Sequence, residues 1–263
     1  GGHFIDEAEN DIFVGSYKAD AADLEQSGKV YFYRGNSDAS QIVSPQVTIE
    51  GVEKNQWFGF SMDSNDLNND GLDDLAVGTF PYGTRKNTGH VAIFYGGKRF
   101  SGWDGNVENH IFLNNAGFRN VLIGGPVGEA FLGASVILED MDGDSLSDIV
   151  MGAPGIGASL SNEEGSVYFL NNKAEGLNSD YSLEKGEFNT LLHGENADDW
   201  FGFKMVTLDF NSDGYRDLAI GARYADDSDS MDDGKVYIFL GREGRTGKEK
   251  IVLGPDDKTL NRG

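Results

Sequence analysis

Three loops rich in Asp and Asn contain the residues of this sequence that are best suited to chemistry. Each loop places an oxygen-bearing side chain at positions 1, 3, 5 and 9 of a nine-residue run. These side chains are Asp66, Asn68, Asp70 and Asp74 in the first loop, Asp140, Asp142, Asp144 and Asp148 in the second, and Asp209, Asn211, Asp213 and Asp217 in the third. Alternate residues of a tight loop can direct their oxygens at one point, and calcium takes six to eight oxygen ligands. The spacing therefore predicts about three calcium ions.

Two other positions of each loop complete this prediction. Position 7 has no ligating side chain, so we expect its backbone carbonyl to be a ligand; the residues are Leu72, Leu146 and Tyr215. Position 6 should carry the sharp turn, which glycine permits. Gly71 and Gly214 occupy it in two loops, whereas Ser145 must make the same turn with a side chain.

Other interpretations of the loops explain less. An EF-hand needs flanking helices and a Glu at position 12, but that position is Val77, Met151 or Ile220. Asx turns, in which Asp and Asn bond to their own backbone, would account for a single loop. Three loops in register with the same flanking segments favour a metal site. The all-oxygen ligand set favours calcium over zinc or copper, and magnesium is the weaker alternative.

Composition excludes several classes of function. The 263 residues have a net charge of −23, with 44 acidic and 21 basic residues, so nucleic acid is a poor partner. The absence of cysteine excludes disulfides, thiolate metal sites and cysteine nucleophiles. No run of about 18 apolar residues is present, so we expect no membrane insertion. The four histidines are scattered and no catalytic motif is found, so we predict no enzymatic activity.

The loops belong to a larger internal repeat. An aromatic or apolar pair with glycine precedes each loop by a fixed distance, and a glycine followed by an apolar run comes after it. The pairs are Phe58-Gly59, Leu132-Gly133 and Phe201-Gly202, and the later runs begin at Gly89, Gly165 and Gly234. A partial copy comprises residues 11–15 and 28–33, with only residues 6–11 available for its loop, so the first repeat should lack a metal site.

The periodicity within each repeat is that of strands. β-Branched and aromatic residues dominate the short apolar runs, and the 37 glycines suit many tight turns. A fourth strand of each repeat is expected near residues 46–49, 121–123, 189–192 and 250–253. Four strands in about 70 residues form one propeller blade. We therefore predict an all-β propeller of four-stranded antiparallel blades, with four visible at about 1–50, 51–123, 124–192 and 193–263, either complete or part of a larger propeller.

The combined pattern resembles the FG-GAP repeat of integrin α-subunit propellers. Phe58-Gly59, Phe201-Gly202 and Gly152-Ala153-Pro154 carry the resemblance, with degenerate copies at Gly78 and Gly221. The resemblance implies that the calcium loops join the first two strands of a blade and that ligands engage the opposite face. The sequence has no cysteine and no Asn-x-Ser/Thr site, which indicates a microbial or divergent relative.

The expected function is recognition or adhesion, at a cell surface or in the extracellular or periplasmic space. The partner would be a protein or carbohydrate on the propeller face, with self-association or further blades closing the propeller. A polysaccharide lyase or hydrolase that carries the propeller is the alternative.

Loops between the second and third strands vary most. Their candidate contacts are Tyr82, Arg85 and Lys86, and the acidic set Asp226, Asp227, Asp229, Asp232 and Asp233.

Overall fold

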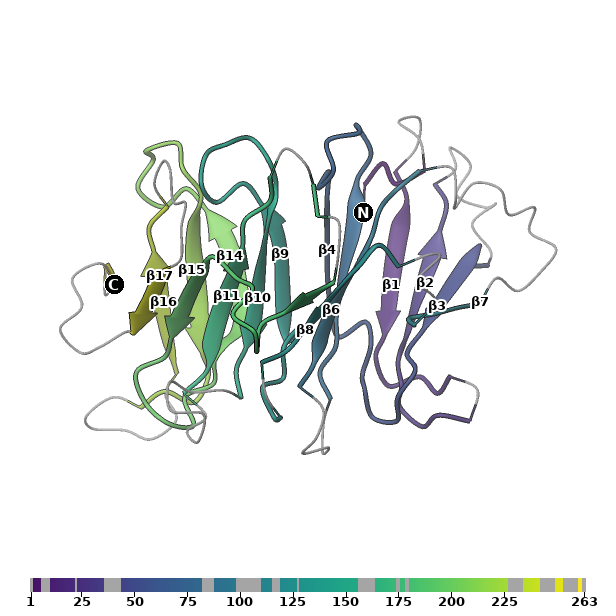
Figure 1. Ribbon diagram of the computed structural model, residues 1–263, viewed down its shortest axis with the longest axis horizontal. Coiled ribbons are helices and arrows are strands. Elements are labelled where there is room, and N and C mark those ends of the chain that lie inside the picture. Colours follow the sequence, from purple (N-terminus) through teal and green to yellow (C-terminus); the bar gives the residue numbers. More distant parts are fainter. Residues whose placement is uncertain are drawn as a thin grey trace.

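The computed structural model contains only strands, turns and loops in the part of the chain it describes. That part comprises residues 2–5, 10–21, 23–35, 44–81, 88–97, 110–114, 119–126, 128–155, 164–173, 176–177, 180–226, 234–241, 249–252 and 260–261. Its strands form four sheets. The sheets stand side by side in chain order, from the purple N-terminal sheet on the right of Figure 1 to the yellow-green sheet on the left. The predicted all-β architecture is therefore confirmed.

Three of the sheets contain the predicted four-stranded antiparallel blade. The second sheet has β4 (Ser61–Asn65), β5 (Asp74–Gly78), β6 (His90–Phe94) and β8 (Val121–Gly124). The third has β9 (Ser135–Glu139), β10 (Asp148–Ala153), β11 (Ser166–Leu170) and β13 (Thr190–His193). The fourth has β14 (Phe201–Leu208), β15 (Asp217–Ala222), β16 (Lys235–Phe239) and β18 (Leu260–Asn261). Neighbouring strands in each set pair antiparallel.

The first sheet begins at the second strand of the repeat. It contains β1 (Ile12–Ser16), β2 (Lys29–Tyr33) and β3 (Val47–Glu50), paired antiparallel. The Asp11-to-Gly15 segment of β1 matches the Asp74-to-Gly78 segment of β5, so β1 is equivalent to the second strand of the other sheets. Among the described residues, no strand pairs with the remaining edge of β1.

Each of the first three sheets gains a further strand from the repeat that follows it. β7 (His110–Phe112) pairs parallel with β3, β12 (Tyr181–Ser182) with β8, and β17 (Glu249–Val252) with β13. All three lie in the connection between the third and fourth strands of the next sheet. They cover the outer edge of the preceding sheet, which would otherwise present unpaired backbone groups.

This arrangement corrects one strand assignment. Residues 250–253 were expected to form the fourth strand of the last repeat, but β17 pairs with β13 of the third sheet. The fourth strand of the last sheet is β18, which pairs with β16. The apolar run identifies a strand, whereas its partner depends on which sheet edge lies within reach of the connection.

Three apolar layers separate the four sheets. Phe32, Val77 and Phe94 belong to the layer between the first and second sheets, and each is fully buried. Residues 75–77 of β5 are buried throughout, as expected for a strand covered on both faces. In β15, Leu218 and Ile220 are buried against the third sheet, while Ala219 on the other face is only half-buried.

Candidate metal loops and an aromatic face

The Asp/Asn loops connect the first and second strands of three sheets. They lie between β4 and β5, between β9 and β10, and between β14 and β15. Each first strand runs from an aromatic–Gly turn to a loop, so the turns and the loops lie at opposite ends of the strands. The sequence repeat therefore places three similar loops at corresponding positions of successive sheets.

The carboxylate at position 1 closes each loop by accepting two backbone N–H groups. Asp66 accepts hydrogen bonds from Asp70 N at 3.2 Å and Gly71 N at 2.9 Å. Asp209 accepts from the same two positions, Asp213 N and Gly214 N, both at 3.1 Å, whereas Asp140 accepts from positions 4 and 6, Gly143 N at 2.7 Å and Ser145 N at 2.8 Å. In all three loops the position-1 carboxylate therefore closes the turn.

Positions 3 and 5 make the Asx turns that the sequence allowed. Asn68 Oδ1 accepts from Asp70 N at 3.0 Å, and Asp70 Oδ1 accepts from Leu72 N at 2.9 Å. The second and third loops repeat both bonds at 2.9 to 3.2 Å. These bonds fix the direction of the side chains and leave further lone pairs on each oxygen. The Asx turns are therefore compatible with cation binding.

The second loop brings three carboxylates together. One oxygen from each of Asp140, Asp142 and Asp148 lies within 4.8 Å of the others, and Asp142 and Asp148 are buried. Burial, and to a lesser extent the charges of Asp142 and Asp144, raise the pKa of Asp148 to about 7. Burial also raises the pKa of Asp142, against the hydrogen bond that Asn171 Nδ2 donates at 2.6 Å. Such a cluster requires protons or a cation to offset its repulsion.

Position 9 has a structural role that the spacing did not reveal. Asp74 Oδ2 accepts from Leu67 N at 2.8 Å and Asn68 N at 3.1 Å, while its Oδ1 accepts from Gly96 N at 2.8 Å. Asp148 and Asp217 likewise bond to the start of their own loop and to the segment after the third strand. This carboxylate therefore fastens the loop to the sheet. Burial is the main cause that raises the pKa of Asp74 to about 7.

Asp11 makes the same connection in the first repeat. Its Oδ2 accepts from Phe4 N at 3.1 Å and Ile5 N at 3.0 Å, and its Oδ1 accepts from Gly35 N at 2.9 Å. Burial raises the pKa of this carboxyl group. Residues 6–9 lie outside the described residues, so the expected absence of a first metal site stays a prediction.

Two positions of each loop adopt a left-handed backbone. Position 6 has φ of +88° at Gly71, +69° at Ser145 and +89° at Gly214, which confirms that Ser145 makes the turn with a side chain. Position 4 is also left-handed; its residues are Asn69, Gly143 and Ser212. The second loop thus has its glycine at position 4, whereas the other two loops have it at position 6. The sequence pattern predicted the turn at position 6 but not the left-handed residue at position 4.

Aromatic rings from all four repeats form one contiguous cluster at the end of the strands opposite the loops. We call this cluster the aromatic face; it comprises Tyr17, Trp57, Phe60, Phe80, Phe131, Trp200, Phe203 and Tyr224. Phe80 is buried at its centre, with its ring centroid 4.7 Å from that of Phe60 and 5.0 Å from that of Phe131. Phe60 also lies 6.3 Å from Phe203, which joins the second repeat to the fourth.

Three cations lie over these rings. Lys18 Nζ is 4.8 Å from the Trp57 ring, and Lys204 Nζ is 5.1 Å from the Phe60 ring. The guanidinium of Arg223 lies 5.4 Å from the Trp200 ring. Among the described residues, none of the three cations forms an ion pair with a carboxylate. The aromatic face therefore carries three positively charged side chains on a strongly acidic chain.

The residue before the glycine of each aromatic–Gly pair packs in the core, whereas the aromatic residue that precedes it does not. Phe58, Leu132 and Phe201 are fully buried. Trp57 and Trp200, which directly precede two of them, are only half-buried and belong to the aromatic face. An aromatic residue precedes each pair in the sequence, and this recurrence could have revealed the aromatic face.

Other candidate contacts fall largely outside the described part of the chain. Tyr82, Arg85 and Lys86 are outside it, as are Asp227, Asp229, Asp232 and Asp233 of the acidic set. Asp226 is described and exposed.

Comparison with known proteins agrees with the repeat pattern. Residues 201–239 match the FG-GAP repeat model. The chain is 28% identical to integrin alpha-4 of Xenopus laevis over 86% of this chain, and 30% identical to integrin alpha-PS2 of Drosophila melanogaster over 72%. The chain carries FG-GAP repeats of the integrin α type. These matches cover 19% and 12% of the two relatives' lengths, so the chain spans less than a fifth of either.

A second group of similar proteins is named for an enzymatic activity. The chain is 28% identical to phosphatidylinositol-glycan-specific phospholipase D of Rattus norvegicus, over 90% of this chain and 27% of the relative. Among the described residues, no helix is long and apolar enough to cross a membrane.

Proposed function

We propose that this chain is a calcium-stabilised recognition module of the extracellular space or cell surface, the periplasm included. Calcium rigidifies one end of the sheets, and the aromatic face at the other end binds a protein or carbohydrate partner. The contiguous cluster of partly exposed rings and cations, drawn from all four repeats, is the observation that supports recognition most directly. The similarity to integrin α subunits supports the same class of function.

The proposed calcium ligands are the side chains at positions 1, 3, 5 and 9 and the carbonyl at position 7 of each loop. The second loop supports this assignment best, because Asp140, Asp142 and Asp148 already offer oxygens within 4.8 Å of one another. A bound cation would offset the repulsion of these carboxylates and hold the first strand against the second. Millimolar extracellular calcium would load even weak sites of this type.

The aromatic face suits a partner that offers flat apolar surface and negative charge. Aromatic side chains such as Trp and Tyr supply large contact areas and are enriched where binding energy concentrates. Lys18, Lys204 and Arg223 add positive charge at the same place. Acidic proteins and acidic polysaccharides offer the complementary groups.

The test is partner binding with single substitutions on and off this face. Glycan arrays and arrays of extracellular proteins, probed in calcium, would supply candidate partners. Trp200→Ala should weaken binding at least tenfold, because truncating a central interface tryptophan commonly costs about 2 kcal/mol or more. Phe210→Ala is the matched control, since Phe210 is 52% exposed and follows β14 at the loop end. Equal loss in both variants, or loss in neither, would contradict the assignment.

The second candidate is the body of an enzyme acting on a polysaccharide or a glycan-bearing lipid. The observation that favours it is the similarity to the phospholipase D of rat across 90% of this chain. Turnover measured with the purified chain separates the two functions. If this chain hydrolyses or eliminates a glycan substrate in a calcium-dependent reaction, it is an enzyme rather than a recognition module.

A further inference from the structure

Two residues after the third strand of each repeat, a backbone N–H holds the position-9 carboxylate of the loop, or its equivalent Asp11 in the first repeat. Glycine supplies this N–H in three repeats, with bonds of 2.7 to 2.9 Å; the residues are Gly35, Gly96 and Gly241. The third repeat has Asn172 instead, and its N–H donates to Asp148 Oδ1 at 2.8 Å. A Cβ atom would lie only 2.5 Å from a backbone oxygen at Gly96 and 2.1 Å at Gly241. The side chain of Asn172 is therefore an exception to the repeat.

This side chain reaches the Asp/Asn loop of the neighbouring sheet. Asn172 Nδ2 donates to the backbone carbonyl of Leu67 at 2.5 Å. Leu67 is position 2 of the first loop, and its side chain packs in the apolar layer between the second and third sheets. Asn172 is 3% exposed and Leu67 is 1% exposed, so water does not compete for this bond. The third repeat thus holds the first loop through a buried hydrogen bond.

A continuous path of hydrogen bonds joins two of the proposed calcium ligands. Asp74 Oδ2, at position 9 of the first loop, accepts from Leu67 N at 2.8 Å. The carbonyl of Leu67 accepts from the side chain of Asn172, and the backbone N–H of Asn172 donates to Asp148, at position 9 of the second loop. Each bond requires its own loop to be closed. An ion that orders one loop therefore places a group that the other loop needs.

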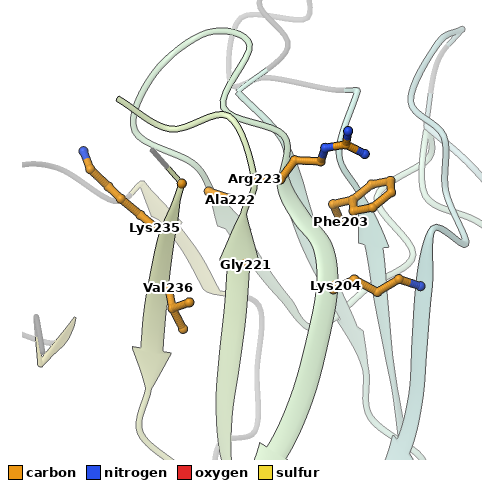
Figure 2. Close-up of a pocket in the computed structure, with 8 residues that line it drawn as sticks. Phe203, Lys204, Gly221, Ala222, Arg223, Lys235 and Val236 are labelled. Atoms are coloured by element: carbon orange, nitrogen blue, oxygen red, sulfur yellow. The ribbon is translucent and has the colours of Figure 1, made fainter. Parts of the chain in front are cut away.

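The third and fourth sheets meet through different side chains. Lys204 Nζ donates to Ala134 O at 3.4 Å at the turn end of the strands, where Figure 2 shows Lys204 beside Phe203. Near the loops, Arg216 Nε lies 3.5 Å from Glu139 Oε1, and the two side chains are 49% and 26% exposed. Ion pairs that are open to solvent contribute little. We therefore expect the third loop to be coupled to the second more weakly than the first loop is.

We propose that Asn172 couples the calcium sites of the first and second loops, so that an ion bound in one loop raises the affinity of the other. Asn172 is a positioning residue, because it acts through the carbonyl of Leu67 and the carboxylate of Asp148. The coupling rests on the proposed calcium sites. Coupling between two binding sites is reciprocal and commonly changes each affinity by about 5- to 150-fold.

Calcium titration calorimetry of three related chains measures this coupling. Asp213→Ala, at position 5 of the third loop, leaves a chain with two sites. Adding Asp144→Ala leaves only the first loop, and adding Asp70→Ala instead leaves only the second. The coupling factor is the ratio by which the two-loop chain binds its pair of ions more tightly than the product of the two single-loop affinities. We expect a factor of at least about five.

Asn172→Ala, made in the same three chains, should bring the coupling factor close to one. Asn65→Ala is the matched control, because Asn65 Nδ2 also donates to a leucine carbonyl of the neighbouring sheet, that of Leu138 at 3.1 Å, but this bond lies outside the path. The control should keep the factor of the parent chain. Asn172→Gly, which gives the residue found at this position in the other repeats, is the second variant, and circular dichroism checks that each chain is folded.

The possible failures are distinguishable. A factor of one in the parent two-loop chain, or a factor that Asn172→Ala and Asn172→Gly leave unchanged, would overturn the coupling and leave the calcium sites in place. A factor lost equally in Asn65→Ala would also overturn the proposal, because general contact between the sheets would then carry the coupling. No calcium binding in any of the three chains would overturn the proposed calcium sites, and the coupling with them.

Discussion

Two buried carboxylates should make the metal-free chain less stable as the pH rises. Burial, reinforced by neighbouring carboxylates, raises the pKa of Asp74 and of Asp148 from the ordinary value of 3.8 to about 7. The folded chain therefore holds protons at these sites over a pH range in which the unfolded chain has released them. Their contribution to stability is most favourable below about pH 4 and is lost progressively as the pH rises to about 7.

The expected magnitude is large compared with the stability of a domain. Once a carboxylate is ionised in both the folded and the unfolded chain, a pKa raised by about 3 in the folded chain lowers the free energy of unfolding by about 4 kcal/mol. Domains are stable by only about 5–15 kcal/mol. Calcium bound to the ionised loops would reverse this loss, by about 2.7 kcal/mol per site when its free concentration is 100 times the dissociation constant. Calcium should therefore stabilise the chain strongly near neutral pH and weakly in acid.

Thermal unfolding followed by circular dichroism tests this coupling. It is measured from pH 4.5 to pH 7.5, once in EDTA and once in 5 mM calcium, a concentration of the order that loads extracellular sites. The melting temperature in EDTA should fall across this range, and the difference between the calcium and EDTA curves should widen. Sodium chloride at matched ionic strength controls for general screening of the net charge of −23. A melting temperature in EDTA that is constant with pH, or a calcium effect that is equal at both ends, would refute the reasoning.

Two substitutions test the loops and their fastening separately. Ser145→Gly should raise the free energy of unfolding by about 1 kcal/mol in urea titrations, because a non-glycine residue is strained at φ of +69°. Ser145→Ala is the control. An equal gain in stability in the alanine variant would show that backbone strain is not the cause. Asp11→Ala should lower that free energy by about 3 kcal/mol or more, since the N–H groups of Phe4, Ile5 and Gly35 lose their acceptor. Calcium content should stay the same in the Asp11 variant, and a fall would place Asp11 in a metal site.

Repetition explains why so much of the fold could be predicted from the sequence. The order of turn, loop and third strand recurs three times, so the strand order of the second and third sheets and of the first three strands of the fourth sheet followed from one interpretation. The parallel strand β17 could not be assigned this way. Its partner β13 belongs to another repeat, and only the arrangement of the sheets brings the two together.

The site was predicted in part for a similar reason. Spacing identifies which side chains can meet, but it does not show which backbone groups they bond. Asp74 and its equivalents fasten the loop to the sheet by accepting hydrogen bonds from backbone N–H groups such as that of Gly96. Residue types do not show where such backbone groups lie. The aromatic face depends on left-handed residues such as Trp57 and Trp200, with φ of +51° and +55°, whose side chains leave the core that Phe58 and Phe201 fill.

Calcium stoichiometry tests the central claim most directly. The chain is dialysed to equilibrium against 1 mM calcium, again an extracellular level, and its metal content is measured by inductively coupled plasma mass spectrometry. The account predicts three ions in the unsubstituted chain, one for each loop, and two in Asp144→Ala, which removes the position-5 carboxylate of the second loop. A chain without bound calcium, or an Asp144→Ala variant with the same content as the parent, would contradict it.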